Sequence, residues 1–198
     1  SPNIVHHDAP DLDRAAQLCV ARGFANAGQA CISVQRVYVH RDIFDSFVER
    51  AAEYAKQIKY GDPHDPETVV GPMISEAEAI RAETWIREAV EAGARAIVGG
   101  GRSGALLEPA VLVGVNDGMK VVCQEVFAPV ISILPYDDIG EAFRRANASN
   151  LGLQVGLFTS NLQLAMRAAQ TLEFGGVIIN DVSTYRTDVM PYGGVKDS

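Results

Sequence analysis

The sequence predicts an α/β fold, a mostly parallel open sheet with helices on both faces, formed by residues 1–198 as a single domain. Short β-branched and apolar segments alternate with amphipathic helical patterns of about 10 to 15 residues, the order typical of β-α-β units. With 198 residues, 47% of them hydrophobic and 21% charged, the chain can bury one full core. No internal repeat, low-complexity tract or linker divides it.

The first elements read clearly in order. A short strand at residues 3–5 is followed by an amphipathic helix over residues 12–24, which places Cys19 on its buried face. Residues 34–39 form a β-branched strand, and Asp42 is expected to cap a second helix over residues 43–58. Residues 60–75, with three prolines and two glycines, are a long connection.

The alternation then continues to the end of the chain. A Ser75-x-x-Glu78 capping box begins a helix over residues 76–92, which is expected to turn Ile80 and Val90 inward. Strands are expected at residues 96–98, 109–115, 130–134, 153–159 and 177–180, and helices at 139–148 and 162–172. Since such sheets bind ligands beyond the carboxyl ends of their strands, the site is expected at that edge.

Charge and cysteine usage exclude several classes of function. The chain carries 17 Lys and Arg against 25 Asp and Glu, a net charge of −8, so a nucleic-acid partner is not expected. Its first residues do not show the charged-then-apolar order of a signal peptide, and no apolar run approaches about 18 residues, so we expect no membrane contact and a cytoplasmic location. Three widely spaced cysteines without a C-x-x-C pair, and four histidines without a spacing signature, indicate reduced thiols and no metal site.

Cys31 is the candidate nucleophile. It ends a segment rich in glycine and alanine, residues 24–31, between a helix and a strand. Small neighbours let a substrate and a cofactor approach the sulfur and its backbone N–H closely. The alternative is that Cys31 is a buried small apolar residue, as free cysteines often are.

Three segments together point to a family. Phe24 to Cys31 reads F-x-x-x-G-Q-x-C, Glu125 to Val130 reads E-x-F-x-P-V, and residues 191–196 read P-Y-G-G-V-K. With these motifs in this order, the chain resembles the catalytic, cysteine-bearing domain of the aldehyde dehydrogenase superfamily over nearly its whole length. Residues 147–153, N-A-S-N-L-G-L, also look like a family segment.

The resemblance implies that an aldehyde is oxidised to a carboxylic acid with NAD or NADP as cofactor. Cys31 would attack the aldehyde carbon, a hydride would pass from the thiohemiacetal to the nicotinamide, and water would release the thioester. Glu125 would hold the hydroxyls of the nicotinamide-side ribose, and Phe127 would pack beside the nicotinamide. From the residues alone, Glu125 is interpreted as a solvated charge and Phe127 as a core aromatic side chain. An acyl-transferring, CoA-linked dehydrogenase is an alternative.

The resemblance also implies that the complete enzyme contains segments that are not within residues 1–198. The family's general-base glutamate lies in an E-L-G-G segment just before the position of Ser1, and the nucleotide-binding domain and the C-terminal oligomerisation tail are absent as well. We therefore expect the catalytic domain alone, inactive by itself, from an enzyme that is a homodimer or homotetramer. Within the motifs, Ala128 stands where glycine is usual, and Ser33 where relatives mostly have alanine or another small residue.

The substrate, a small aldehyde, is less defined. Arg186 could pair with the carboxylate, phosphate or sulfonate of an anionic aldehyde, or it could be an ordinary surface arginine. Two other functions stay open: a cysteine hydrolase with a Cys-His pair, and a degenerate interaction domain without catalysis. An unreactive Cys31 would favour the interaction domain.

Overall fold

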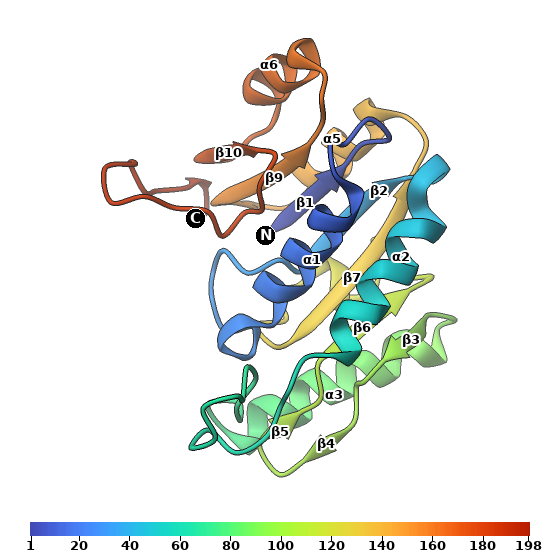
Figure 1. Cartoon of the computed structure of the whole chain (residues 1–198), viewed down its shortest axis with the longest axis vertical. Helices are drawn as coiled ribbons and strands as arrows, with labels where there is room; N and C mark the ends of the chain where they lie inside the picture. The colour runs from blue at the N-terminus through green and yellow to red at the C-terminus, as the bar shows by residue number, and fades with distance from the viewer.

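A seven-stranded sheet in the order β10-β9-β1-β2-β7-β6-β3 runs through the protein (Figure 1). The structure is a computed structural model that describes all residues, 1–198. Neighbouring strands are parallel except β3 and β6, so the predicted mostly parallel α/β sheet is confirmed. The strands of this sheet are β1 (Pro2–Val5), β2 (Arg36–His40), β3 (Arg95–Val98), β6 (Ala110–Val113), β7 (Val130–Tyr136), β9 (Gln154–Phe158) and β10 (Gly176–Ile179).

Helices cover both faces of the sheet, because the chain winds across it in two directions. The β1-α1-β2 unit steps one way, whereas β7-α5-β9 and β9-α6-β10 step the other way, and right-handed crossovers in opposite directions place their helices on opposite faces. In Figure 1, α1 and α2 lie in front of the sheet and α5 behind it. The helices are α1 (Leu12–Phe24), α2 (Arg41–Lys56), α3 (Glu76–Glu91), α4 (Lys120–Cys123), α5 (Ile139–Asn147) and α6 (Leu162–Thr171).

The core lies between the sheet and its helices. Every residue of β1, β6 and β9 is buried, as expected of inner strands covered on both faces. Cys19 on α1 is only 1% exposed, which confirms its predicted place in the core. No helix combines the length and the apolar character that a membrane span requires.

Two local predictions are wrong. The residue that caps α2 is His40, whose ring nitrogen accepts the backbone N–H of Asp42, so Asp42 lies in the first turn instead. On α3, Ile80 and Val90 are 44% and 43% exposed. This helix packs against the short helix α4, the edge strand β3 and the short strands β4 (Arg102–Ser103) and β5 (Leu106–Leu107). Its buried stripe is narrow: Ala79, Ala82, Ile86 and Ala89.

Several short elements lie outside the predicted pattern. A helical turn at Ala25–Gly28 follows α1, the β4–β5 hairpin follows β3, and β8 (Leu151–Gly152) pairs with β11 (Val195–Lys196) in a second small sheet. Segments of two to four residues carry no periodicity that a sequence pattern could report. Two of them, the Ala25–Gly28 turn and the β8–β11 pair, build the candidate site.

Candidate active site

A left-handed turn leads from α1 to Cys31. Asn26, Ala27 and Gly28 have φ angles of 53°, 54° and 66°, a region that non-glycine residues rarely occupy. The side chain of Asn26 donates to the carbonyl of Gln29 at 3.0 Å, and the Gln29 side chain donates back to the Asn26 carbonyl at 3.3 Å. Strained backbone held by such reciprocal bonds is typical of functional sites.

Cys31 follows in a tight turn whose ends are fixed on both sides. The N–H of Ser33 donates to the carbonyl of Ala30 at 2.9 Å, so the exposed Cys31 sits near the tip of this turn. The Ser183 hydroxyl donates to the carbonyl of Ile32 at 2.9 Å, and Ser183 is itself paired with Asn3 in β1. The thiol is therefore carried by a positioned backbone and is not a buried core residue.

Asn3 is the buried residue that supports Ser183. Asn3 is fully buried in β1 among apolar residues. Its amide forms two hydrogen bonds with Ser183, which lies near the other end of the sequence. A polar side chain in a buried strand needs a partner, because an unpaired one would cost roughly 1–3 kcal/mol. Asn3 could thus have been singled out as a positioning residue from the strand pattern alone.

Gly28 locks the Cys31 loop against the second motif. A Cβ atom at Gly28 would lie 2.0 Å from the carbonyl oxygen of Ala128, so only glycine lets the two backbones approach this closely. Ala128 belongs to the segment that carries Glu125 and Phe127. The first and second motifs, far apart in the sequence, therefore meet in space.

Gln35 holds the second motif from the other side. Its side-chain amide donates to the carbonyl of Gln124 at 2.7 Å and accepts the N–H of Val126 at 3.3 Å. The Val126 carbonyl in turn accepts a hydrogen bond from Arg81 of α3 at 2.7 Å. The sequence pattern did not identify Gln35 or Arg81, because their roles depend on how the loops pack.

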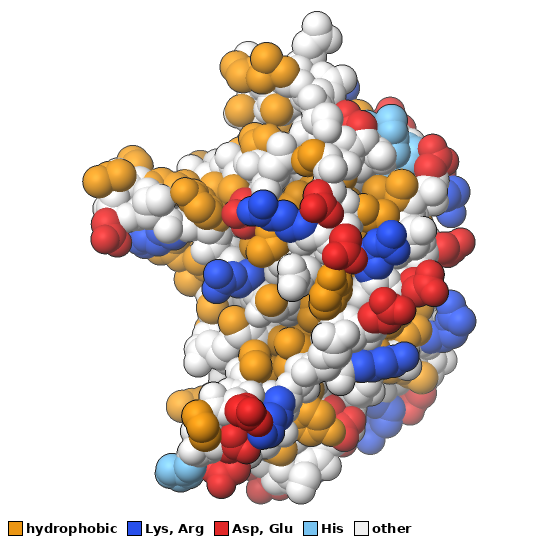
Figure 2. All heavy atoms as spheres, viewed as in Figure 1, with side chains coloured by type: hydrophobic (Ala, Val, Ile, Leu, Met, Phe, Trp, Pro, Cys, Tyr) orange, Lys and Arg blue, Asp and Glu red, His pale blue; other side chains and the backbone are white.

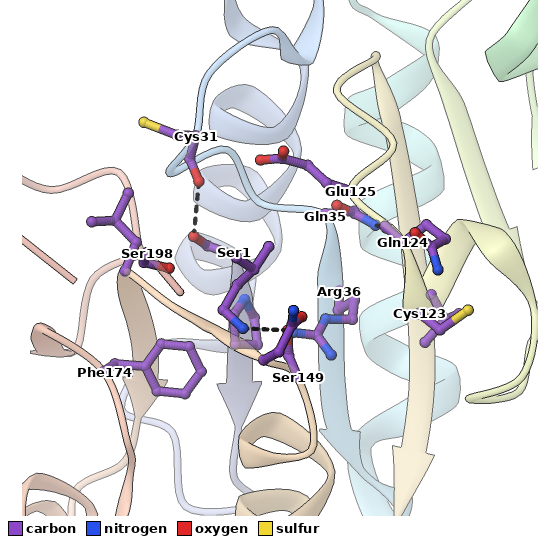
Figure 3. A pocket seen from close by; sticks show the side chains of 15 residues that line it. Ser1, Cys31, Gln35, Arg36, Cys123, Gln124, Glu125, Ser149, Phe174 and Ser198 are labelled. Atoms are coloured by element: carbon purple, nitrogen blue, oxygen red, sulfur yellow. Dashed lines mark hydrogen bonds between the residues drawn. The ribbon is translucent and has the colours of Figure 1, made fainter. Parts of the chain in front are cut away.

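Glu125 and Phe127 both face outward. The Glu125 side chain lies on the rim of a cavity of about 610 Å³ that Cys31 and Cys123 also line, together with Ser149 and Leu153 (Figure 3). Phe127 is 40% exposed and has a φ of 51°, which excludes its reading as a core aromatic side chain. In Figure 3 the Glu125 carboxylate points toward the Cys31 loop.

The third motif closes the site from the C-terminal end. β11 pairs with β8, which joins residues 191–196 to the N-A-S-N-L-G-L segment. Gly175 approaches Gly193 so closely that a Cβ atom there would lie 1.7 Å from the Gly193 carbonyl oxygen. Lys196 binds the carbonyls of Asn147 and Ser149 at 2.7 and 3.0 Å. All the motif segments are thus brought to one region.

Tyr192 of the third motif links Cys31 to Arg186. The Tyr192 hydroxyl lies 3.1 Å from the Cys31 sulfur, and the Arg186 guanidinium stacks over the Tyr192 ring, 4.3 Å from its centroid. The hydrogen bond to Cys31 and partial burial raise the pKa of Tyr192, while the Arg186 charge opposes this shift. The phenol therefore keeps its proton at neutral pH and can donate it to a thiolate.

The site lies at the opposite edge of the sheet from the one predicted. Cys31 precedes the amino end of β2, and Glu125 precedes the amino end of β7. The expected carboxyl edge applies when the loops leaving the strands build the site, whereas here both residues lie on loops that enter strands.

None of the four histidines contacts the Cys31 sulfur, whose side-chain partner is Tyr192. His64 is bound to Asp62 in the long connection, and the other three lie at the carboxyl edge of the sheet. The Cys-His pair of the hydrolase alternative is therefore not assembled.

Sequence comparison agrees with the fold and with the convergence of the motifs. The whole chain, residues 1–198, matches the model of the aldehyde dehydrogenase family. The chain therefore belongs to the aldehyde dehydrogenase family, a family of oxidoreductases.

Two curated relatives are similar to this chain over its whole length. A 3-sulfolactaldehyde dehydrogenase of Priestia megaterium is 52% identical over 198 residues, which are all of this chain and 41% of the relative. A lactaldehyde dehydrogenase of Methanococcus maripaludis is 41% identical over 198 residues, all of this chain and 42% of the relative. The chain thus spans about two fifths of the length of these curated relatives.

Solved structures give the same result. The glyceraldehyde-3-phosphate dehydrogenase GapN of Methanocaldococcus jannaschii, complexed with NADP, superposes with a TM-score of 0.95 at 40% identity, over 99% of this chain and 42% of that one. Aldehyde dehydrogenase 21 of Physcomitrella patens, complexed with the product succinate, has a TM-score of 0.95 at 41% identity, over 100% and 41% of the two chains.

Proposed function

We propose that this chain is the cysteine-bearing catalytic domain of an NAD- or NADP-dependent enzyme that oxidises a small anionic aldehyde to a carboxylic acid. The main observation behind the proposal is that the Cys31 loop packs closely against the Glu125–Ala128 segment at Gly28, in a chain of this family. This packing places the Cys31 thiol and the Glu125 carboxylate in the lining of one cavity.

Cys31 is the nucleophile of this proposal. Its exposed sulfur would add to the aldehyde carbon to form a thiohemiacetal, and water would later release the acid from the thioester. Bound NAD or NADP would supply the acceptor for the hydride that the thiohemiacetal loses. The Tyr192 hydroxyl lies 3.1 Å from the Cys31 sulfur, within hydrogen-bond reach of the attacking atom. The backbone N–H of Cys31, in its tight turn, is a candidate donor to the oxyanion of the tetrahedral intermediate.

In this proposal, Glu125 and Phe127 contact the cofactor. An exposed carboxylate offers two acceptor oxygens to the paired hydroxyls of a ribose. Phe127, 40% exposed beside it, offers an aromatic face on which a nicotinamide ring can pack. NAD and NADP are equally compatible with these two side chains, since neither would contact the 2′-phosphate that distinguishes the cofactors.

Arg186 is the reason for proposing an anionic substrate. Its guanidinium stacks on Tyr192, whose hydroxyl contacts the Cys31 sulfur, and it takes part in none of the ion pairs of the chain. A cation held one side chain away from the nucleophile, without a protein counter-ion, suits a substrate that brings its own negative charge. The relative that is 52% identical acts on 3-sulfolactaldehyde, an aldehyde with a sulfonate group.

The selectivity of the complete enzyme tests Arg186. We expect Arg186→Gln to lower kcat/KM for 3-sulfolactaldehyde by about 10- to 100-fold, because a hydrogen bond to a charged group is worth roughly 1.5–3 kcal/mol. Lactaldehyde, which lacks only the sulfonate, should change by less than about twofold. Steady-state assays with both aldehydes measure the difference.

Arg87→Gln is the matched control for the loss of one positive charge. Arg87 lies on α3, is exposed and pairs weakly with Glu91 at 3.8 Å. The Arg87→Gln variant should leave kcat/KM for both aldehydes unchanged. Equal losses with the two aldehydes in Arg186→Gln would reject the role of Arg186 in selectivity and leave the proposal for Cys31 untouched.

Thiol reactivity tests the nucleophile directly. With limiting iodoacetamide, we expect Cys31 to be alkylated at least about tenfold faster than Cys123 near neutral pH, because a nucleophilic cysteine is the more reactive one. The Cys31 sulfur has the Tyr192 hydroxyl at 3.1 Å, whereas the Cys123 sulfur has only a long contact with a carbonyl. Both sulfurs are exposed, so access alone does not separate them, whereas buried Cys19 should stay unlabelled in the folded protein. Peptide mass spectrometry over a pH series gives the three rates.

Tyr192→Phe tests the cause of this difference. Losing one hydrogen bond should slow the alkylation of Cys31 by about 2- to 10-fold and leave Cys123 unchanged. If Cys123 reacts as fast as Cys31 in the unaltered protein, the catalytic proposal fails and the interaction-domain alternative moves ahead.

A further inference from the structure

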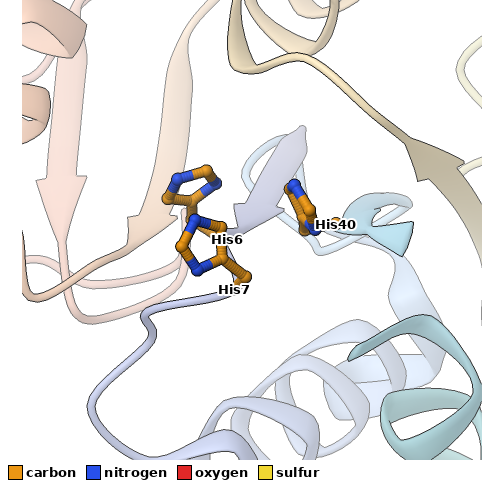
Figure 4. Close-up of side chains that lie close together, drawn as sticks. All are labelled: His6, His7 and His40. Carbon is orange, nitrogen blue, oxygen red and sulfur yellow. The ribbon is translucent and has the colours of Figure 1, made fainter. Parts of the chain in front are cut away.

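Three of the four histidines gather at the carboxyl edge of the sheet, away from Cys31. His6 and His7 directly follow β1, and His40 is the last residue of β2 (Figure 4). The parallel register pairs Val5 with Val39, so His6 and His40 stand at the same level on neighbouring strands. The β1-α1-β2 unit therefore brings together imidazoles that are distant in the sequence.

The three rings form a compact group. One ring nitrogen of each histidine lies within 4.8 Å of those of the other two. The ring centroids are 4.2 Å apart for His6 and His7, 4.8 Å for His7 and His40, and 5.3 Å for His6 and His40. His7 is exposed while the other two are half-buried, so the group opens to solvent.

The surroundings of His6 leave one ring nitrogen free. The hydroxyl of Tyr136 lies 3.4 Å from the carbonyl of Val5 and 2.9 Å from Nδ1 of His6. When this hydroxyl donates to the Val5 carbonyl, it can accept a hydrogen bond from Nδ1–H, and in that tautomer the lone pair of Nε2 is available to a metal ion.

His40 lies beside a carboxylate that can orient it as a ligand. Its Nδ1 accepts the N–H of Asp42 at 3.2 Å and lies 3.6 Å from the Asp42 carboxylate. Coordination through Nε2 would move the ring proton to Nδ1, so the ring would give up the Asp42 N–H and donate its Nδ1–H to the Asp42 carboxylate instead. Carboxylate–histidine–metal arrangements of this kind orient the ligand and raise its basicity.

We propose that His6, His7 and His40 form a binding site for a divalent transition-metal ion of the zinc class, with water in the remaining position. Three imidazoles without a thiolate suit Zn²⁺, Ni²⁺ or Cu²⁺, in contrast to the hard oxygen ligands that Mg²⁺ and Ca²⁺ need. Bonds of about 2.0–2.1 Å place tetrahedral nitrogens roughly 3.3 Å apart, so the rings close in slightly on binding. The exposed His7 has the freedom to do so.

The position in the fold supports a ligand site. β1 and β9 are neighbours whose connections leave on opposite faces, through α1 and α6, and α/β sheets bind ligands beyond the carboxyl ends of such strands. The five-residue strand β2 separates this edge from the Cys31 loop, a length of about 16 Å. The ion would therefore tie the ends of β1 and β2 together and would not take part in the chemistry at Cys31.

Titration of the metal-free protein tests the site. All variants carry Cys31→Ser and Cys123→Ser, so that the exposed thiols do not compete for the ion. We expect one Zn²⁺ per chain by calorimetry, and Co²⁺ to give visible d–d bands without a sulfur charge-transfer band. His7→Ala and His40→Asn should each weaken Zn²⁺ binding by at least about tenfold, the loss that follows even from removing an outer-shell partner.

The variants are chosen to keep the fold. Asn at position 40 still caps α2, and circular dichroism with thermal unfolding in metal-free buffer should match the parent protein. His64→Ala is the matched control, because His64 is exposed in the long connection and lies outside the group. Absence of Zn²⁺ binding, or binding that survives both His7→Ala and His40→Asn, would overturn the proposal.

Discussion

Replacing Cys31 by serine is expected to abolish aldehyde oxidation by the complete enzyme, lowering kcat/KM by at least about 10⁴-fold, as the loss of a covalent nucleophile does elsewhere. Serine keeps the shape of the side chain, so the turn between Ala30 and Ser33 should persist, but a hydroxyl has no activated anion at neutral pH. Rates of NADH or NADPH formation measure the effect.

Cys123→Ser is the matched control for this experiment. Cys123 is exposed and lines the same cavity, and its thiol makes only a long contact, 3.7 Å, to the carbonyl of Gly118. We expect its replacement to change the rate by less than about twofold. Retained turnover in Cys31→Ser would contradict the proposed mechanism, as would loss of turnover in Cys123→Ser alone.

The 198-residue chain by itself provides a second control. On the proposed function, the general base and most of the cofactor site belong to sequence outside this chain, which spans about two fifths of its relatives. The purified chain should therefore show reactive Cys31 but no reduction of NAD or NADP with any aldehyde. Robust turnover by the purified chain would mean that one of its own residues acts as the general base.

The alternation of helices and strands was predictable because periodicity reports local burial. Inner strands such as β6 are apolar throughout, and the stripe of α1 places Cys19 in the core. The same reasoning failed on α3, where Ile80 and Val90 match the helical period but face away from the narrow contact with the sheet edge. A pattern gives the apolar side of a helix but not how much of that side finds a partner.

The candidate residues could be singled out from the sequence, whereas the way the fold brings them together could not. Cys31, Glu125 and Phe127 were found through motifs, but the edge of the sheet on which they meet depends on loops that enter strands. Contacts such as Gln35 with Gln124 involve side chains with no signature in the sequence. The histidine group could have been anticipated, because His6 and His40 end two strands that a β-α-β unit must pair.

Gly28→Ala is expected to destabilise the protein by roughly 2–5 kcal/mol, as the sum of left-handed strain of about 1–2 kcal/mol and an overpacking cost of about 1–3 kcal/mol. The added Cβ atom would lie 2.0 Å from the carbonyl oxygen of Ala128, and a backbone group cannot turn aside as a flexible side chain would. Urea unfolding followed by circular dichroism measures the loss.

Gly104→Ala separates the two causes. Gly104 has a φ of 58°, close to the 66° of Gly28, but a Cβ atom there meets nothing within 4 Å. It should therefore cost only the strain, about 1–2 kcal/mol. Equal losses in the two variants would show that the Cys31 loop and the Glu125–Ala128 segment can separate freely. A larger loss in Gly28→Ala, together with slower alkylation of Cys31, would mean that this backbone contact both stabilises the fold and positions the thiol.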